Sequence, residues 1–174
     1  MITVISGTNR VSSHTSRIAS IYHGILKEHA PESQFFDLAG LPSECLLSEV
    51  YDHADKPHQV QKIQDEIFIP SSKFIFIIPE YNGSFPGVLK LLIDGMDPRP
   101  AFRNKKAALV GVSTGRAGNI RGMDHLSSVL HHMQVTVMPY LLPVSSVHKF
   151  QDDEKLMKDT LTLFQQHIRR FIDF

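Results

Sequence analysis

The stretch FIFIIPEYNGSFPG, residues 74–87, predicts both the fold and the position of a binding site. Its first five residues form an apolar run that is short enough to be a buried β-strand. The residues from Pro79 to Gly87 then form a polar, glycine-containing turn, and a helical pattern begins at Val88. Because open α/β sheets bind ligands at the carboxyl ends of their strands, we expect this turn to border a binding site.

The size and composition are those of an ordinary globular protein. The chain has 174 residues, and we expect residues 1–174 to form a single domain. Lysine plus arginine equals aspartate plus glutamate, 18 against 18, so the basic excess typical of nucleic-acid-binding proteins is missing. The single cysteine, Cys45, excludes an internal disulfide and is typical of a reducing compartment. No apolar run reaches membrane-spanning length. We therefore expect a cytoplasmic protein with no nucleic-acid or membrane partner.

Strand and helix patterns alternate along the chain, which is typical of a parallel sheet with helices on both faces. The expected strands are 2–6, 33–38, 73–78, 106–112 and 134–138. The expected helices are 15–28, 58–68, 86–95, 121–133 and 151–174, with a short helix near 44–51. This pattern predicts an α/β protein with the flavodoxin-like three-layer α/β/α fold, a five-stranded parallel sheet of order 2-1-3-4-5. In the last helix, we expect the core to take up Leu156, Leu163, Phe164, Ile168 and Phe171.

The predicted strand order brings three loops to one edge of the sheet. Residues 7–14, 79–87 and 113–119 follow strands one, three and four, and they are the loops richest in glycine and hydroxyl groups. These strands lie side by side in the order 2-1-3-4-5, around the point where the chain reverses direction across the sheet. Convergence of three such loops indicates a binding site more strongly than any one loop does.

The first loop is suited to a phosphate group. Thr8, Ser13 and Thr15 supply hydroxyl donors, and Arg10 supplies a charged donor. The start of the following helix adds backbone N–H groups and the positive end of a dipole. The alternative is an ordinary turn with Ser13 or Thr15 as the helix N-cap.

The other two loops also have plainer interpretations. The loop after strand three is compatible with a simple turn that starts a helix, but that interpretation leaves Tyr81 and Asn82 unexplained. The loop at 113–119 is compatible either with a ligand contact or with a turn that ends in an N-cap at Asn119. The sequence leaves both interpretations of this third loop open.

Several kinds of site are excluded by the sequence. No Gly-Lys-Thr arrangement follows strand one, and Gly7 is the only glycine of its loop, so neither a nucleoside-triphosphatase loop nor a dinucleotide fingerprint is present. The ten histidines show no metal-ligand spacing, and no nucleophile elbow is evident. We therefore assign no metal site and no catalytic side chain.

Three motifs in order make the chain resemble the NADPH-dependent FMN reductase family, which includes flavodoxin-like quinone and azo-compound reductases. The first is Gly-Thr-Asn-Arg-Val-Ser-Ser at 7–13, the second is Pro-Glu-Tyr-Asn-Gly-Ser-Phe-Pro-Gly-Val-Leu-Lys at 79–90, and the third is Gly-Val-Ser-Thr-Gly-Arg at 111–116. The resemblance spans roughly residues 2–137, and the second motif is the most specific. The chain departs from the family pattern at Thr8, where serine is usual, at Thr15, where asparagine is usual, over residues 91–95 after Lys90, and at Asn119, where a second glycine is usual.

The resemblance implies that different loop residues contact different parts of FMN. Thr8, Arg10, Ser13 and Thr15 would hold the FMN phosphate. The isoalloxazine ring would be bordered, largely through backbone groups, by Pro79, Glu80, Tyr81, Asn82 and Gly83. Its other side would be closed by Ser113, Thr114 and Gly115.

The resemblance also implies the activity: hydride transfer from NADPH or NADH to bound FMN, then on to a quinone, an azo compound or a similar acceptor. A non-enzymatic electron carrier is the alternative, although such carriers usually have an acidic surface and this chain is formally neutral. A third alternative is a structural or regulatory protein that has lost its flavin, which the intact motif at 79–90 argues against.

We expect a homodimer or homotetramer, because the helix after the flavin loop carries apolar residues around much of its circumference. These residues are Val88, Leu91, Leu92 and Met96, more than one face of a sheet is expected to bury.

Overall fold

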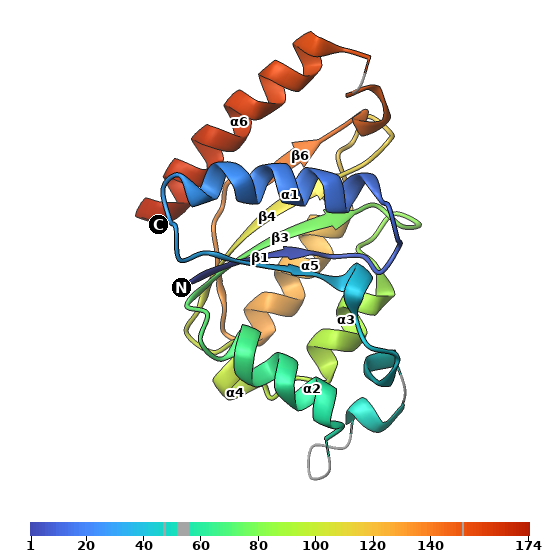
Figure 1. Ribbon diagram of the computed structural model, residues 1–174, viewed down its shortest axis with the longest axis vertical. Coiled ribbons are helices and arrows are strands. Elements are labelled where there is room, and N and C mark those ends of the chain that lie inside the picture. The colour runs from blue at the N-terminus through green and yellow to red at the C-terminus, as the bar shows by residue number, and fades with distance from the viewer. Residues whose placement is uncertain (47, 52–55, 151) are drawn as a thin grey trace.

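The computed structural model describes residues 1–46, 48–51, 56–150 and 152–174. Its centre is a parallel sheet in the order β2-β1-β3-β4-β5, with β6 also paired to β4 (Figure 1). The strands are β1 (Ile2–Ser6), β2 (Gln34–Asp37), β3 (Lys73–Pro79), β4 (Lys106–Val112), β5 (Thr136–Val137) and β6 (Leu142–Val144). The expected strand order, and with it the flavodoxin-like fold, is confirmed.

The fifth position of the sheet is shared by β5 and β6. Lys106 of β4 is in register with Thr136, and Val110 of β4 with Leu142, so the two short strands pair with successive parts of β4. The sequence predicted one strand over 134–138. It missed β6 because Pro139, which has no N–H to donate to a neighbouring strand, interrupts the pairing directly after Met138.

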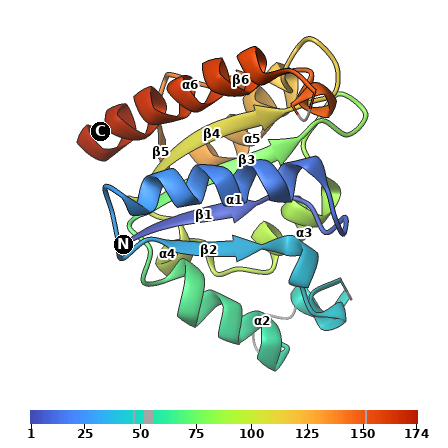
Figure 2. The same cartoon turned by 45° about the horizontal axis from the view of Figure 1, so that its top comes forward.

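Helices cover both faces of the sheet. On one face lie α1 (His14–Lys27) and α6 (Glu154–Asp173), and Figures 1 and 2 show them crossing the sheet on the same side. The other face is covered by α2 (His58–Ile63), α3 (Gly87–Asp94), α4 (Pro98–Ala101) and α5 (Ile120–His132). Within β3, Phe74 and Phe76 pack in the core under α2, α3 and α5, whereas Ile75 and Ile77 pack in the core under α1 and α6. This alternation explains why the strand is apolar throughout, since both of its faces are buried.

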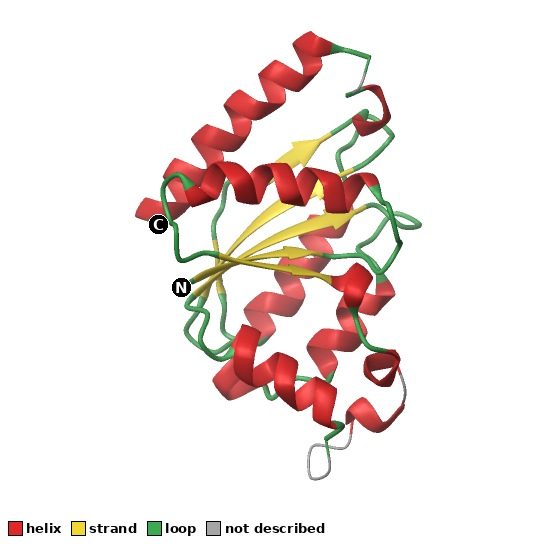
Figure 3. Cartoon of the chain, viewed as in Figure 1, coloured by secondary structure: helices red, strands yellow, loops and turns green. Residues whose placement is uncertain are grey.

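The region between β2 and β3 departs most from a regular pattern (Figure 3). The helix expected over 58–68 is α-helical only to Ile63 and continues as a π-helical segment over Gln64–Phe68. The short helix expected near 44–51 is replaced by two 3-10 turns, Ser43–Leu46 and Ser48–Tyr51. A further 3-10 turn, Leu38–Gly40, follows β2, and another, Val147–Lys149, precedes α6.

Two expectations about apolar residues are corrected by the structure. In α6, Leu163 is 38% exposed, whereas Phe164, Ile168 and Phe171 are buried as expected. In and after α3, Leu92 and Met96 are buried within the chain itself, and Val88 and Leu91 are partly buried against the same core. The 3-10 turn Ser43–Leu46 lies against α3 and extends the surface that this helix can bury, so one sheet face is not its only cover.

No helix within the described parts of the chain is long and apolar enough to cross a membrane.

Candidate functional site

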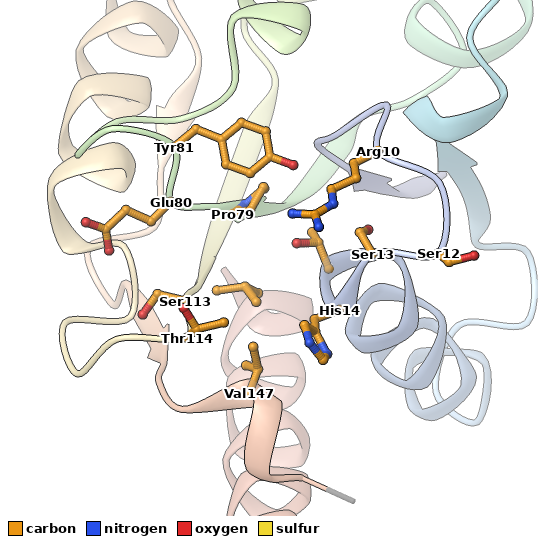
Figure 4. Close-up of a pocket in the computed structure, with 12 residues that line it drawn as sticks. Arg10, Ser12, Ser13, His14, Pro79, Glu80, Tyr81, Ser113, Thr114 and Val147 are labelled. Atoms are coloured by element: carbon orange, nitrogen blue, oxygen red, sulfur yellow. The ribbon is translucent and has the colours of Figure 1, made fainter.

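A pocket of about 230 Å³ lies at the carboxyl ends of β1, β3 and β4 (Figure 4). It is bordered by the three loops that the sequence singled out. Its lining residues are Arg10, Ser12, Ser13, His14, Thr15, Pro79, Glu80, Tyr81, Val112, Ser113, Thr114 and Val147. The predicted convergence of the three loops is therefore present in the structure.

Most of the predicted site residues line this pocket, and four do not. Arg10, Ser13, Thr15, Pro79, Glu80, Tyr81, Ser113 and Thr114 line it. Thr8 is fully buried and does not line the pocket. Asn82, Gly83 and Gly115 lie on the bordering loops, but outside the lining.

The loop after β1 forms a polar end of the pocket. Ser13 is the N-cap of α1, and its hydroxyl oxygen accepts a hydrogen bond of 3.0 Å from the Ser16 N–H. A hydroxyl group that accepts one hydrogen bond still has its own proton to donate. Figure 4 shows the Arg10 guanidinium pointing toward the middle of the pocket, whereas the Glu80 carboxylate points away from it. This end of the pocket is therefore positively charged and rich in hydrogen-bond donors.

The backbone at Gly7 explains how this loop enters the site. Its N–H donates to the Ile77 carbonyl at 2.9 Å, which holds the start of the loop against β3. A Cβ at this position would lie 2.8 Å from a methyl group of Ile78 and 3.2 Å from the Ile77 carbonyl oxygen. Only glycine fits this approach without displacement of β3.

The loop after β3 ends in a tight turn. The Tyr81 N–H donates to the Ser84 carbonyl at 2.9 Å, and the Ser84 N–H donates back to Tyr81 at 3.1 Å. Asn82 and Gly83, between them, have φ values of 51° and 76°, which are typical of an Asn-Gly hairpin turn. Asn82 and Gly83 therefore shape the loop, and Tyr81 is the residue that enters the pocket.

The third loop combines the two interpretations that the sequence left open. Ser113 and Thr114 line the pocket, and Asn119 is the N-cap of α5, with its side-chain oxygen accepting from the Gly122 N–H at 3.1 Å. Ser113 also organises the loop internally, because its hydroxyl donates to the Gly115 carbonyl and accepts from the Gly118 N–H, both at 3.0 Å.

Four lining residues were missed by the sequence analysis: Ser12, His14, Val112 and Val147. Ser12 lies inside the first motif and His14 directly follows it, so their neighbours could have pointed to them. Val112 is the last residue of β4, a position that the strand-end argument also reaches. No local signal marks Val147, which reaches the pocket from the 3-10 turn before α6 (Figure 4).

Comparison with known proteins places the chain among flavin-dependent reductases. The model of the NADPH-dependent FMN reductase family matches residues 1–149. A quinone reductase of Pseudomonas putida is 31% identical, over 98% of this chain and 91% of that protein. An FMN-dependent NADPH-azoreductase of Staphylococcus aureus is 28% identical, over 98% of this chain and 90% of that protein.

Solved structures agree with the fold. An oxidoreductase from Corynebacterium diphtheriae superposes with a TM-score of 0.72 at 16% identity, covering 99% of this chain and 97% of that one. An azoreductase from Bacillus anthracis gives a TM-score of 0.65 at 16% identity, with 98% and 99% covered. The sequence matches favour an oxidoreductase that uses FMN and NADPH over a non-enzymatic electron carrier. The chain belongs to the NADPH-dependent FMN reductase family, as its three loop motifs indicated.

Proposed function

We propose that this protein is an NAD(P)H-dependent FMN reductase that delivers electrons to a quinone, an azo compound or a similar small acceptor. The observation that carries the proposal is the pocket at the ends of β1, β3 and β4, with a cationic hydroxyl-rich end and a wall of Pro79, Tyr81 and Val112. Such a pocket is suited to a ligand that is anionic at one end and flat at the other. Names of the relatives, quinone reductase and FMN-dependent NADPH-azoreductase, support the same substrate classes.

The donor set fits the phosphate of FMN. Arg10 supplies a charged donor, Ser13 and Thr15 supply hydroxyl groups, and α1 begins at His14, beside the pocket. A phosphate at a helix start is stabilised by the free N–H groups and by the dipole. We assign the phosphate to Arg10, Ser13 and Thr15, with Ser12 and His14 as further lining residues.

Two backbone N–H groups at the flat end of the pocket are already hydrogen-bonded within the protein. The Glu80 N–H donates to the Val112 carbonyl at 3.0 Å, and the Tyr81 N–H donates to the Ser84 carbonyl at 2.9 Å. We therefore assign contact with the isoalloxazine ring to the side chains of Pro79 and Tyr81, and the contact expected from the backbone of Asn82 and Gly83 stays a prediction. Ser113 and Thr114 lie on the other loop of the same wall.

Bound FMN would supply the redox chemistry, which is hydride transfer from NADPH or NADH and delivery of two electrons to the acceptor. The chain's own residues would bind the cofactor and orient it in the pocket. We assign no side-chain acid or base.

An anaerobic titration tests this function. The purified protein, loaded with FMN, is mixed with NADPH or NADH while the flavin absorbance is followed. We expect direct loss of the oxidised flavin spectrum and its recovery when a quinone is added. An electron carrier would respond to dithionite but not to either nicotinamide, and that result would overturn the reductase assignment.

The remaining expectations belong to the same proposal. We propose that residues 1–174 act as one FMN-binding domain, that the protein works in the cytoplasm, and that it forms a homodimer or homotetramer. A hollow of about 540 Å³ between α3 and α5 supports the oligomer, because Ile93, Met96, Val129 and Met133 give it an apolar floor. Lys90 and Asp94 lie at its rim and pair with each other at 2.7 Å.

A further inference from the structure

Asn119 connects the pocket loops although it does not line the pocket. Its side chain is 1% exposed, and its amide nitrogen donates to the carbonyl groups of Ile78 at 3.1 Å and Pro79 at 2.8 Å. Its amide oxygen accepts from the Gly122 N–H at 3.1 Å. Both ends of this buried amide are therefore hydrogen-bonded, as buried polar groups require.

The two carbonyl groups belong to the last residues of β3, immediately before the segment that enters the pocket. The next peptide N–H, of Glu80, is held by the Val112 carbonyl at 3.0 Å. The peptide between Pro79 and Glu80 is thus fixed on both sides, by Asn119 and by the end of β4. The direction in which Pro79 and Tyr81 leave the sheet depends on these bonds.

The loop that carries Asn119 is itself rigidly placed. A Cβ at Gly111 would collide with the Gly118 carbonyl oxygen, and Gly118 has a φ of 57°. Asn119 has a φ of 60°, a left-handed conformation that asparagine tolerates better than most residues. An amide held in this way couples the position of the loop after β3 to that of the loop after β4.

We propose that Asn119 is a positioning residue for the flavin, because it joins the loop after β3 to the loop after β4. In Figure 4 these two loops, with Pro79, Tyr81, Ser113 and Thr114, face the loop that holds Arg10 and Ser13 across the pocket. Asn119 therefore organises the wall assigned to the ring, and none of the three side-chain hydrogen bonds described for it is to Arg10, Ser13 or Thr15, the residues assigned to the phosphate. This inference rests on the proposed function, since it takes FMN as the ligand.

Two substitutions separate the contacts of Asn119. Asn119→Gly keeps the left-handed backbone accessible and removes every side-chain contact. Asn119→Asp keeps the oxygen that accepts from Gly122 but replaces the donor by an acceptor that faces two carbonyl groups. The same two changes at Asn104 are matched controls, because Asn104 has a φ of 61° and is exposed, away from the pocket lining.

The readout is the dissociation constant of flavin from the folded apoprotein, measured by quenching of flavin fluorescence for FMN and for riboflavin. We expect Asn119→Gly to weaken both ligands by about tenfold or more and by the same factor, because the phosphate end is unchanged. Asn119→Asp should weaken both ligands more at pH 8 than at pH 5, since a protonated carboxyl group regains a donor for the Pro79 carbonyl. The Asn104 variants should bind both ligands as the wild type does.

Other results overturn the inference. Unchanged flavin affinity in Asn119→Gly would show that the loops keep their places without the amide, and loss of FMN affinity alone would place the effect at the phosphate. If Asn119→Gly does not fold, Asn119→Asp decides, and equal flavin affinity at the two pH values contradicts the proposal. Wild-type protein that binds neither flavin would instead refute the proposed function, and this inference with it.

Discussion

The Tyr81 hydroxyl lies 2.8 Å from the Thr8 hydroxyl, so a hydrogen bond joins the loop after β3 to the loop after β1. Thr8 is fully buried, and its oxygen also accepts from the Arg10 N–H at 3.2 Å. With both contacts made inside the protein, Thr8 acts in the structure as the anchor of Tyr81 and of the Arg10 backbone. The phosphate contact that the resemblance implied for Thr8 stays a prediction beside this anchoring role.

Removal of the hydrogen bond between Tyr81 and Thr8 should therefore affect FMN and riboflavin equally. Tyr81→Phe and Thr8→Val each remove this bond, and a net loss of about 1 kcal/mol in the free energy of unfolding is expected. Thr8→Ser keeps the hydroxyl and serves as the control. A double-mutant cycle by chemical denaturation checks the coupling, and flavin titrations check the binding. Selective loss of FMN affinity in Thr8→Val would instead support a phosphate contact.

Arg10 should contribute to FMN binding through the phosphate. A charge-assisted hydrogen bond contributes about 1.5–3 kcal/mol, so Arg10→Ala should weaken FMN binding by roughly ten- to a hundredfold. Riboflavin, which has no phosphate, should bind the wild type and the variant almost equally. Arg169→Ala, at an exposed position on α6, controls for loss of one positive charge. Equal weakening of both flavins would mean that Arg10 acts on the fold.

His167 should make the protein less stable in acid. It is fully buried, and its Nδ1 lies 2.6 Å from the Tyr22 hydroxyl. Burial lowers the pKa of His167 to about 4, an effect that Arg170 strengthens and the backbone of Tyr140 opposes. Between this pKa and the unfolded value of about 6.5, only the unfolded chain binds the proton, so stability falls as the pH falls through that window.

The size of this effect follows from the difference between the two pKa values, and amounts to roughly 3 kcal/mol lost between pH 6.5 and 4. His167→Gln should flatten this part of the stability profile measured by urea denaturation, whereas His29→Gln, at an exposed position, should leave it unchanged. An equally steep profile in His167→Gln would assign the acid sensitivity to other groups, such as His23, whose pKa is also lowered by burial.

The hollow between α3 and α5 should be covered by a second copy of the chain. Ser128→Arg places a bulky charge at the rim of this hollow, and Ser128 is exposed, with its hydroxyl donating to the Asp124 carbonyl of its own helix. We expect light scattering to report an oligomer for the wild type and a smaller species for the variant. Lys158→Glu, at an exposed position on α6, is the control. A wild type that is monomeric at micromolar concentration would contradict the prediction.

The strands and the three loops could be predicted because both depend on local patterns, and the strand order followed because this alternation of strands and helices matches the flavodoxin-like arrangement. The run at 74–78 is buried on both faces, and its uniformly apolar composition predicts this burial. Errors arose where an element depends on a distant partner. Leu163 follows the helical pattern of apolar residues but lies beyond the surface that the sheet and α1 can cover. His167, by contrast, is polar by composition and buried because Tyr22 and Tyr140 surround it.

The amino-acid sequence was enough to predict the α/β class, the loops that meet at the pocket and the family of the chain, because strand runs, glycine turns and helix starts are encoded within a few consecutive residues. The strand order followed from the match of this pattern to the flavodoxin-like arrangement. Which loop residues line the pocket, and which hold the loops in place, became clear from the folded chain alone. Thr8 and Asn119 carry polar groups suited to a ligand, yet each bonds to residues about 40 or more positions away along the chain. Such pairs come together only when the sheet is assembled, and this is the physical reason why the roles of these two residues could not be read from the sequence.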